Sequence, residues 1–252
     1  MKKILSILLC AVLLLSLVAC GASGAKKGAI TVTDMTGREI SLDEPATRIV
    51  ALTASDCEIL YAIGAGDALV GRGEYCDYPA EVLNVPSVQS GYDTNIEQII
   101  ALKPQVLLMA TMAQTQEQID ALEAAGVKVV VSDAQDIDGV YTAIEMLGKL
   151  MGKEDNAAAV IDGMKTTFSD LAEKAQGDGT KTVYFEVSPL QYGLWTAGKG
   201  TFMNEITEML GLKNAAILNL ANNELSRPAP RLAEGAQMMY DFVYGEAAEN
   251  AA

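Results

Sequence analysis

The sequence contains no histidine, a single tryptophan and far fewer basic than acidic residues. The absence of histidine excludes the Ser-His-Asp triad, the Cys-His dyad and the usual zinc sites, and it argues against a receptor for free zinc or manganese. Lysine and arginine total 18 against 33 acidic residues, a formal charge of -15 that repels phosphate backbones. Most classes of hydrolytic enzyme are therefore not expected. We also expect no nucleic-acid partner, no metal site and no cofactor.

The chain is instead rich in apolar residues. Half of its 252 residues are hydrophobic and 20% are charged. This balance is typical of a well-filled globular core and not of a disordered chain. The length suits one large domain or two small ones.

The first residues have the pattern of an export signal. Two lysines precede an apolar run over residues 4–19, which is short for a membrane-spanning helix, and then come Cys20 and several small residues. The four residues that end at Cys20 (Leu-Val-Ala-Cys) resemble the bacterial lipobox, in which the signal is cut before a cysteine that receives a lipid. We expect a signal peptide over residues 1–19, lipid attachment at Cys20, a tether over residues 20–29 and a place on the outer face of the cell membrane. An ordinary secretion signal with a chance cysteine is the alternative.

Two further cysteines, Cys57 and Cys76, fall within the expected folded part. The outside compartment is oxidising, and their spacing lets two adjacent loops meet, so they are candidates for a disulfide. Two buried free thiols are the alternative. A catalytic cysteine is not expected, because the chain has no histidine to activate it.

After an expected hairpin over residues 30–42, apolar strand patterns alternate with helical ones. The expected strands are residues 49–53, 68–71, 106–109 and 127–131, and the expected helices are residues 56–63, 95–102 and 114–125. Continuous apolar strands that alternate with helices predict a parallel sheet covered on both faces, and hence an α/β fold.

Residues 136–176 carry no strand pattern, and their apolar residues recur at helical spacing, which predicts two connecting helices broken near Gly152. The α/β pattern then resumes. The elements expected there are strands at residues 181–187 and 216–220 and helices at residues 201–210 and 233–244. We therefore expect an N-terminal α/β lobe over residues 30–135 and a C-terminal lobe over residues 177–252 with two clear strands.

Two glycine-rich segments partly match nucleotide-binding motifs. Residues 64–69 begin like a dinucleotide fingerprint but lack its third glycine and follow a helix, so they indicate a helix stop and a turn. Residues 193–200 have the spacing and the lysine of a phosphate loop, but Gly200 replaces the Ser or Thr that would hold Mg²⁺. We interpret them as a tight loop beside a ligand pocket; a phosphate- or nucleotide-binding enzyme that uses the loop Gly193–Gly200 is the alternative.

Polar and aromatic residues gather in the loops that follow the predicted strands, where open α/β sheets bind their ligands. Aromatic rings there would stack on a flat ligand, and an arginine would attract an anionic one. The candidate ligand-binding residues are Tyr75, Tyr92, Thr111, Trp195 and Arg227. The alternative for each aromatic is packing in the core, and Arg231 is expected to pair with surface acids.

Several segments carry a resemblance when taken together. They are residues 48–52, 58–67, 77–79, 95–104, 122–129, 196–205 and 226–232, the last reading Ser-Arg-Pro-Ala-Pro-Arg-Leu. The chain is similar to the solute-binding lipoproteins of ATP-driven (ABC) importers, in the subclass that binds iron–siderophore complexes, haem and vitamin B12. The resemblance implies two Rossmann-like lobes bridged by a long helix, with the ligand in the cleft between them. It also implies a glutamate on each lobe that docks on the permease subunits, and Glu97 and Glu208 occupy the matching places.

The sequence departs from this family in one respect. A further strand and two helices normally follow the segment around residue 214, before the strand that precedes the last helix. The C-terminal lobe is therefore predicted to be reduced, and a degenerate copy that binds no ligand is a second alternative. The resemblance predicts a membrane-tethered receptor, not an enzyme, that captures an iron chelate, haem or a corrinoid and hands it to an ABC permease.

Overall fold

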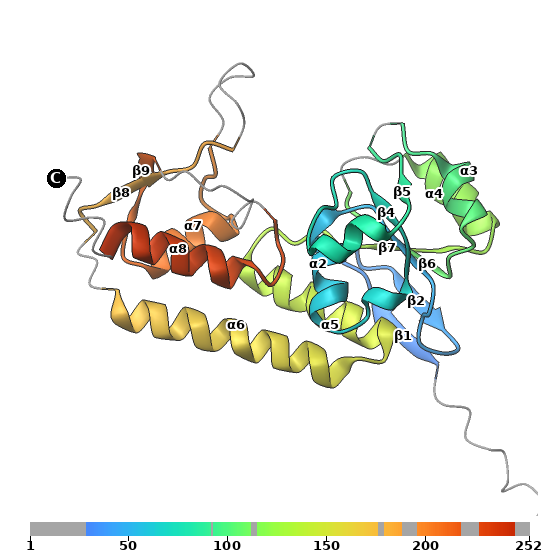
Figure 1. The fold of residues 1–252 in the computed structure, drawn as a ribbon, viewed down its shortest axis with the longest axis horizontal. Coiled ribbons are helices and arrows are strands. Elements are labelled where there is room, and N and C mark those ends of the chain that lie inside the picture. Colours follow the sequence, from blue (N-terminus) through green and yellow to red (C-terminus); the bar gives the residue numbers. More distant parts are fainter. Residues whose placement is uncertain are drawn as a thin grey trace, which may run out of the picture.

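The structure is a computed structural model that describes residues 29–91, 93–111, 115–175, 179–187, 196–217 and 227–244. A five-stranded sheet lies at one end of the molecule and a two-stranded sheet at the other, with helices running between them (Figure 1). The predicted α/β fold with a parallel sheet is confirmed. None of the helices in these ranges is long and apolar enough to cross a membrane.

The larger sheet has the strand order β5-β4-β3-β6-β7, and all neighbouring strands are parallel. Its strands are β3 (Ile49–Ala51), β4 (Leu69–Gly73), β5 (Ser87–Val88), β6 (Val106–Met109) and β7 (Lys128–Val131). The helices that follow β3, β5 and β6 are α2 (Ala54–Ala62), α3 (Ile96–Ala101) and α4 (Gln116–Ala124). Every residue of β3 and β6 is buried, as expected for central strands covered on both faces.

Alternation along the strands divides the core of this end between the two faces of the sheet. Ile49 and Leu108 belong to the large hydrophobic cluster that also contains residues of α2 and of the helices beyond β7. Their chain neighbours Val50 and Leu107 belong to a second cluster with residues of α3 and α4. Successive strand residues point to opposite faces, so one apolar run fills two layers.

A small antiparallel hairpin of β1 (Ile30–Thr33) and β2 (Glu39–Leu42) lies beside the larger sheet. Its turn is organised by the buried carboxylate of Asp34, which accepts hydrogen bonds from the backbone N–H groups of Thr36, Arg38 and Val131. Burial raises the pKa of Asp34, but hydrogen bonds from the Thr36 hydroxyl, from the backbone N–H groups of Arg38 and Val131 and from the Arg38 side chain outweigh it and hold the pKa below its usual value. The charged carboxylate thereby fastens the hairpin to the end of β7.

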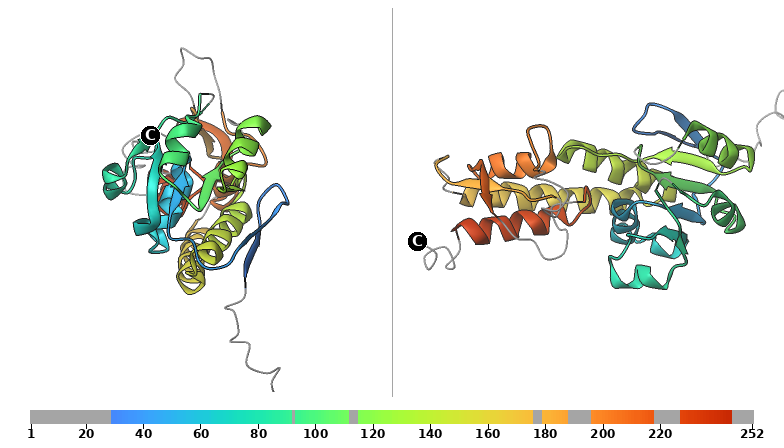
Figure 2. Two further views of the ribbon diagram at one scale, coloured as in Figure 1. Left: turned by 90° about the vertical axis from the view of Figure 1, so that its right-hand side faces the viewer. Right: turned by 90° about the horizontal axis from the view of Figure 1, so that it is seen from above.

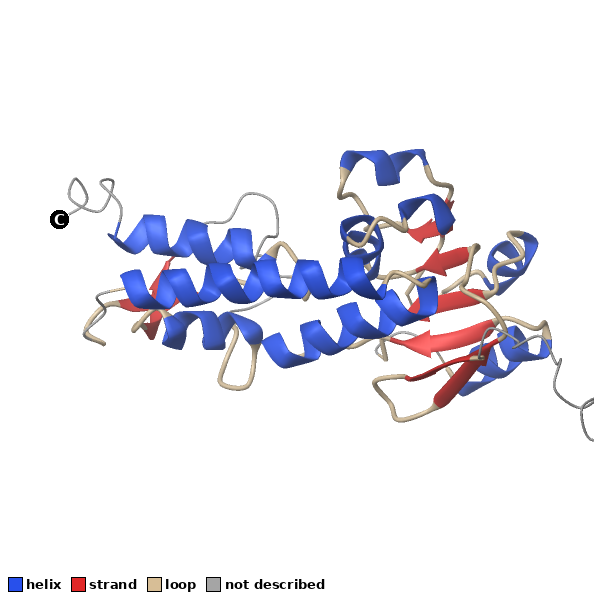
Figure 3. Cartoon of the chain, turned by 90° about the horizontal axis from the view of Figure 1, so that it is seen from below, coloured by secondary structure: helices blue, strands red, loops and turns tan. Residues whose placement is uncertain are grey.

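The connection between the two ends is a pair of packed helices, α5 (Ile137–Met151) and α6 (Glu154–Lys174), broken at Gly152 as the sequence predicts. Gly152 adopts a left-handed conformation with φ 61°, which ends α5. The helices approach closely at their turn, where a Cβ on Gly148 would lie 2.5 Å from the Cβ of Ala157. Both helices run lengthwise through the middle of the molecule (Figure 3).

The smaller sheet pairs β8 (Thr182–Tyr184) with β9 (Lys213–Ile217) in parallel. It is accompanied by α7 (Phe202–Met209) and α8 (Leu232–Tyr244), and α8 packs along α6, where the Tyr240 hydroxyl donates to the carbonyl of Lys174 at 3.4 Å. The large hydrophobic cluster extends into this end, where Val183, Ile206 and Leu232 belong to it. Seen from above, α7 and α8 lie at this end of the molecule, away from the larger sheet (Figure 2, right). The lobe boundaries and the interpretation of the two ends as ligand-binding lobes stay predictions.

Candidate functional site

The candidate site lies at the carboxyl edge of the larger sheet, where the loops after β3, β4, β6 and β7 meet. Asp56 occupies the first turn of α2, directly beyond the central strand β3, and is fully buried. The hydroxyl of the N-cap residue Thr53 donates to one oxygen of Asp56, while the other oxygen, Oδ1, has no hydrogen-bond partner in the described ranges. Burial raises the pKa of Asp56 to about 6.

Beside Asp56, four charged residues form what we call the arginine cluster: Glu58, Asp77, Arg227 and Arg231. Arg227 places Nη1 3.1 Å from Glu58 Oε1 and 2.6 Å from Asp77 Oδ1. Its Nη2 donates to the carbonyl of Tyr75 at 3.3 Å. The arginine precedes α8, whereas its partners lie on α2 and on the loop after β4, so the cluster joins the two ends of the molecule.

Arg231, four residues farther along the chain, completes the cluster. Its Nη1 lies 3.8 Å from the same Glu58 oxygen, and its guanidinium stacks over the ring of Tyr78 at 4.0 Å from the centroid. It also pairs with Glu234 at 3.5 Å. Arg231 thus pairs with a surface acid as expected, but its second partner is a buried carboxylate.

Burial and charge act against each other within the cluster. Burial raises the pKa of Glu58, an effect that the hydrogen bond from Arg227 and the charge of Arg231 oppose. The hydrogen bond from Arg227 lowers the pKa of Asp77. Burial alone would lower the pKa of Arg227, but the two carboxylates raise it above its ordinary value. The guanidinium therefore stays charged and is satisfied by protein partners.

The predicted ligand-binding residues have different surroundings. Tyr75 is 79% exposed beside the cluster, so its ring is free to meet a ligand. The hydroxyl of Thr111 donates to the Asp133 carboxylate and so links the loops after β6 and β7. Tyr92 and Trp195 lie outside the described residues.

The ligand contact predicted for Arg227 stays a prediction, but in this structure the guanidinium is bound to protein groups. Two carboxylates already hold it, one of them buried, and its side chain is only 14% exposed. Arg72 likewise donates to backbone carbonyls, those of Gly73, Cys76 and Val85. Both arginines therefore serve the protein's own loops in this structure.

Sequence reasoning missed Asp56 and Glu58 as members of the site. The available signal was the presence of two acids, Asp56 and Glu58, in the mostly apolar helix α2. A carboxylate that is buried with such a helix requires a polar or charged partner. Its partner could not be identified from local pattern, because Arg227 lies 169 positions from Glu58.

The two predicted permease-docking residues are both exposed. Glu97 lies in the first turn of α3, after the N-cap Asn95, whose side chain accepts from the N–H of Gln98. Glu208 lies near the end of α7 and accepts a hydrogen bond of 2.9 Å from Asn204. The expected lipid-attachment residue, Cys20, lies outside the described residues.

Cys57 and Cys76 lie side by side in the structure as buried free thiols. Both sulfurs face the carbonyl oxygen of Ala51, at 3.9 and 4.0 Å. The structure thus brings the two candidates for a disulfide together as thiols, and the bond between them stays a prediction.

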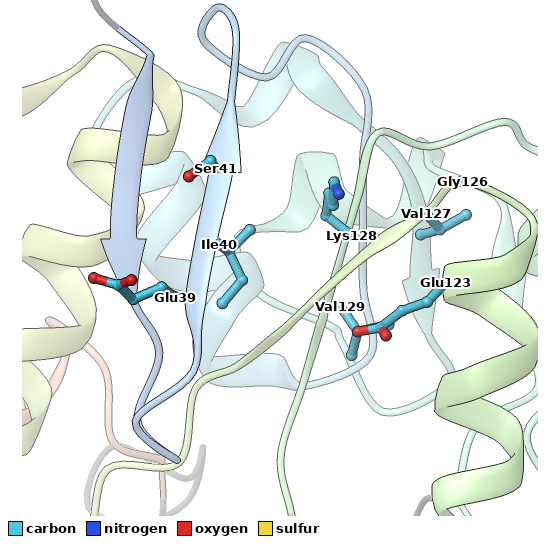
Figure 4. Close-up of a pocket in the computed structure, with 8 residues that line it drawn as sticks. All are labelled: Glu39, Ile40, Ser41, Glu123, Gly126, Val127, Lys128 and Val129. Atoms are coloured by element: carbon cyan, nitrogen blue, oxygen red, sulfur yellow. The ribbon is translucent and has the colours of Figure 1, made fainter.

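One cavity of about 250 Å³ lies away from this edge, between β2 and the start of β7 (Figure 4). It is lined by Glu39, Ile40, Ser41, Glu123, Gly126, Val127, Lys128 and Val129. Because it adjoins the amino end of β7, it is not the predicted ligand site. Within the described ranges no group of three or more cysteine, aspartate or glutamate side chains is arranged to hold a metal ion.

Comparison with known proteins identifies relatives of this chain. An ABC transporter substrate-binding lipoprotein of Bacillus subtilis, YvrC, itself uncharacterised, is 37% identical over 193 residues, which cover 74% of this chain and 61% of the relative. The vitamin B12-binding protein of Yersinia pestis is 28% identical over 68% of this chain and 60% of its own length. A solved structure of a possible iron-binding, periplasmic solute-binding protein from Staphylococcus epidermidis superposes with a TM-score of 0.67 and 26% identity, covering 80% of this chain and all of that one.

The chain spans about three fifths of the length of the curated relatives it matches. The model of the family described as periplasmic binding protein matches residues 49–229. That range contains the larger sheet, the connecting helices, the smaller sheet and Arg227 of the arginine cluster. This protein therefore belongs to the periplasmic binding protein family.

Proposed function

We propose that this protein is the extracytoplasmic binding component of an ABC importer, which captures an iron chelate, haem or a corrinoid and delivers it to the permease. The observation that carries the proposal is the family match over residues 49–229, which contains the carboxyl edge of the sheet with its exposed aromatic ring. The relatives named for substrate binding and for vitamin B12 binding support the same class of activity.

The mechanism is binding without a chemical step. The carboxyl edge of the larger sheet presents Tyr75 for stacking, and the segment from Arg227 to α8 closes against the same edge. A flat ligand of medium size would lose its hydration between these surfaces, and aromatic contact would supply much of the affinity.

Among the three ligand classes, the charges favour a ligand that brings little negative charge. Arg72 and Arg227 are occupied by the protein's own carbonyls and carboxylates. The acids Asp56 and Asp133 add negative charge at the same edge. An anionic siderophore would have to break the arginine cluster, whereas a corrinoid would need only a stacking surface, so cobalamin is our first candidate.

The test is a titration of the purified protein with cyanocobalamin, haemin and a ferric siderophore, followed by Trp195 fluorescence and by calorimetry. We expect heat of binding and quenching with at least one ligand, at micromolar affinity, and strongest for cobalamin. Tyr75→Ala should weaken binding about ten-fold, the loss of one stacking contact. Ile100→Ala, a change at an exposed apolar residue on α3, should leave it unchanged. A folded protein that gives neither heat nor quenching with any of the three would contradict the proposal.

We also propose that a lipid on Cys20 holds the protein at the outer face of the membrane. The support is the lipobox-like sequence and the relative named as a lipoprotein. Incorporation of labelled palmitate into the full chain, lost in Cys20→Ala, tests this. If the label persists in the variant, or never appears, the anchor is wrong.

A further inference from the structure

A pair of buried thiols adjoins the arginine cluster. Cys57 is in the first turn of α2 and Cys76 is in the loop after β4, and neither side chain reaches solvent. Both sulfurs approach the same carbonyl oxygen, that of Ala51, and the Cys57 thiol also hydrogen-bonds Cys76. Two sulfurs that share one small space in this way need little movement to bond.

The position of the pair in the chain connects it with the cluster. Cys57 immediately precedes Glu58, and Cys76 immediately precedes Asp77. Glu58 and Asp77 are the two carboxylates that hold Arg227. A bond between the two sulfurs would therefore join the two backbone segments that form this side of the cluster.

The loop that carries Cys76 is already held in place. Arg72 donates to the carbonyl of Cys76 at 3.0 Å and to that of Gly73 at 3.2 Å, and the N–H of Cys76 donates to Gly73 at 3.2 Å. The hydrogen bond between the thiols raises the pKa of Cys57 and lowers that of Cys76. The same hydrogen bond places the two sulfurs in contact in the finished fold.

We propose that Cys57 and Cys76 form a disulfide that fixes Glu58 and Asp77 around Arg227. The oxidant is a low-molecular-weight disulfide, which the proposed extracytoplasmic location supplies. The Cys76 thiolate attacks one sulfur of that disulfide and releases a thiolate. Cys57 then attacks the Cys76 sulfur of the mixed disulfide and releases a second. The two protons of the protein thiols pass to the released thiolates, so the protein is oxidised and the reagent reduced.

Because both sulfurs are buried in the finished fold, the exchange takes place during folding, before the loop after β4 closes over α2. A metal is not the better explanation of the pair. Within the described ranges no third cysteine or acidic side chain joins it in a metal-binding group.

The experiment uses the full chain with Cys10→Ser and Cys20→Ser, so that Cys57 and Cys76 are the remaining two of its 4 cysteines. The reduced, unfolded chain is refolded with oxidised and reduced glutathione, denatured, treated with N-ethylmaleimide and analysed by mass spectrometry. We expect both cysteines to escape alkylation and to appear in one cross-linked peptide. Alkylation of both after refolding overturns the proposal.

Thermal unfolding of the same chain tests the structural role. The oxidised form should melt roughly 5–10 °C above the reduced form, because the cross-link restricts the unfolded chain. The difference in Tm between oxidising and reducing conditions should vanish in Cys76→Ala. If that variant folds poorly, the comparison of the parent chain with and without reductant still tests the proposal. If the cross-link forms but Tm does not change, the disulfide does not stabilise this part of the fold and the proposal is wrong. Neither measurement uses a ligand, so failure here is distinct from failure of the proposed transport function.

Discussion

Arg227 Nη1 lies 3.1 Å from the buried carboxylate of Glu58, although 169 positions separate the two residues. The Glu58 side chain is only 1% exposed, and its second oxygen, Oε2, has no hydrogen-bond partner in the described part of the chain. A carboxylate in this setting depends on the arginine for its charged state. The segment before α8 is therefore needed for the stability of the larger sheet's edge.

Replacing Arg227 by glutamine should destabilise the fold. The change leaves Glu58 buried without its main ionic partner, and only Arg231 remains, at 3.8 Å. We expect the free energy of unfolding to fall by about 2–4 kcal/mol at pH 7, measured by urea denaturation.

Arg231→Gln is the comparison: it removes the longer contact to the same carboxylate, together with the stacking on Tyr78 and the pair with the exposed Glu234, and it should have a clearly smaller effect. In the double variant Glu58→Gln with Arg227→Gln, the loss should be less than the sum of the single losses, because the two residues stabilise each other. Equal effects of the two arginines, or strict additivity, would show that the cluster does not act as described.

The elements of the larger sheet could be predicted because their signals are local. The buried run of β6 and the break at Gly152 need only neighbouring residues, and both are where the sequence indicates. β5 was missed because its two residues, Ser87 and Val88, are too few to show a period. The start of β9 at Lys213, ahead of the expected strand, depends on pairing with β8.

The site was predictable only as a region. The loops after the strands carry the ring of Tyr75, as expected, because the edge of a parallel sheet collects these loops. No local sequence pattern predicts the ion pair between Glu58 and Arg227 or the contact between Cys57 and Cys76. Such pairs follow from how α2, the loop after β4 and the segment before α8 pack.

Stability should respond to pH through Asp56. Its pKa rises from 3.8 in the unfolded chain to about 6 in the fold, so the folded state favours the protonated acid. This contribution is fully present below about 3.8 and is lost as the pH rises through about 6, an effect of about 3 kcal/mol. Relative to Asp56→Asn, the native protein should lose most of that amount between pH 4 and pH 7.

Urea denaturation of both proteins at several pH values measures the difference. Asp162→Asn, a change at an exposed residue of α6, is the control and should keep a constant difference from the native protein over the same range. A constant difference for Asp56→Asn as well would mean that Asp56 is ionised normally in the fold.

The close approach of β4 to β3 should make Gly73 irreplaceable. A Cβ there would lie 2.2 Å from the backbone oxygen of Leu52, which cannot move without disturbing the strand. Gly73→Ala should therefore destabilise the protein by about 2–3 kcal/mol. Gly163→Ala, in the exposed middle of α6 with no atom within 4 Å of the added carbon, should instead stabilise it by about 0.5–1 kcal/mol. Thermal unfolding of the two variants should shift in opposite directions, and a shift in the same direction would contradict this account of the sheet.

Docking on the permease should depend on Glu97 and Glu208. Both carboxylates are exposed on helices, so their exchange for lysine changes a surface charge, and at Glu208 it also removes the hydrogen bond from Asn204. Charges at an interface rim act mainly on the rate of association, so each change should slow ligand uptake in cells roughly ten-fold at low ionic strength and less at high salt. Ligand affinity of the isolated protein should stay the same. Glu117→Lys on α4 makes the same charge change on another exposed helix and should leave uptake as it was. Uptake that falls equally in all three variants would reflect net charge alone and would remove the special role of Glu97 and Glu208.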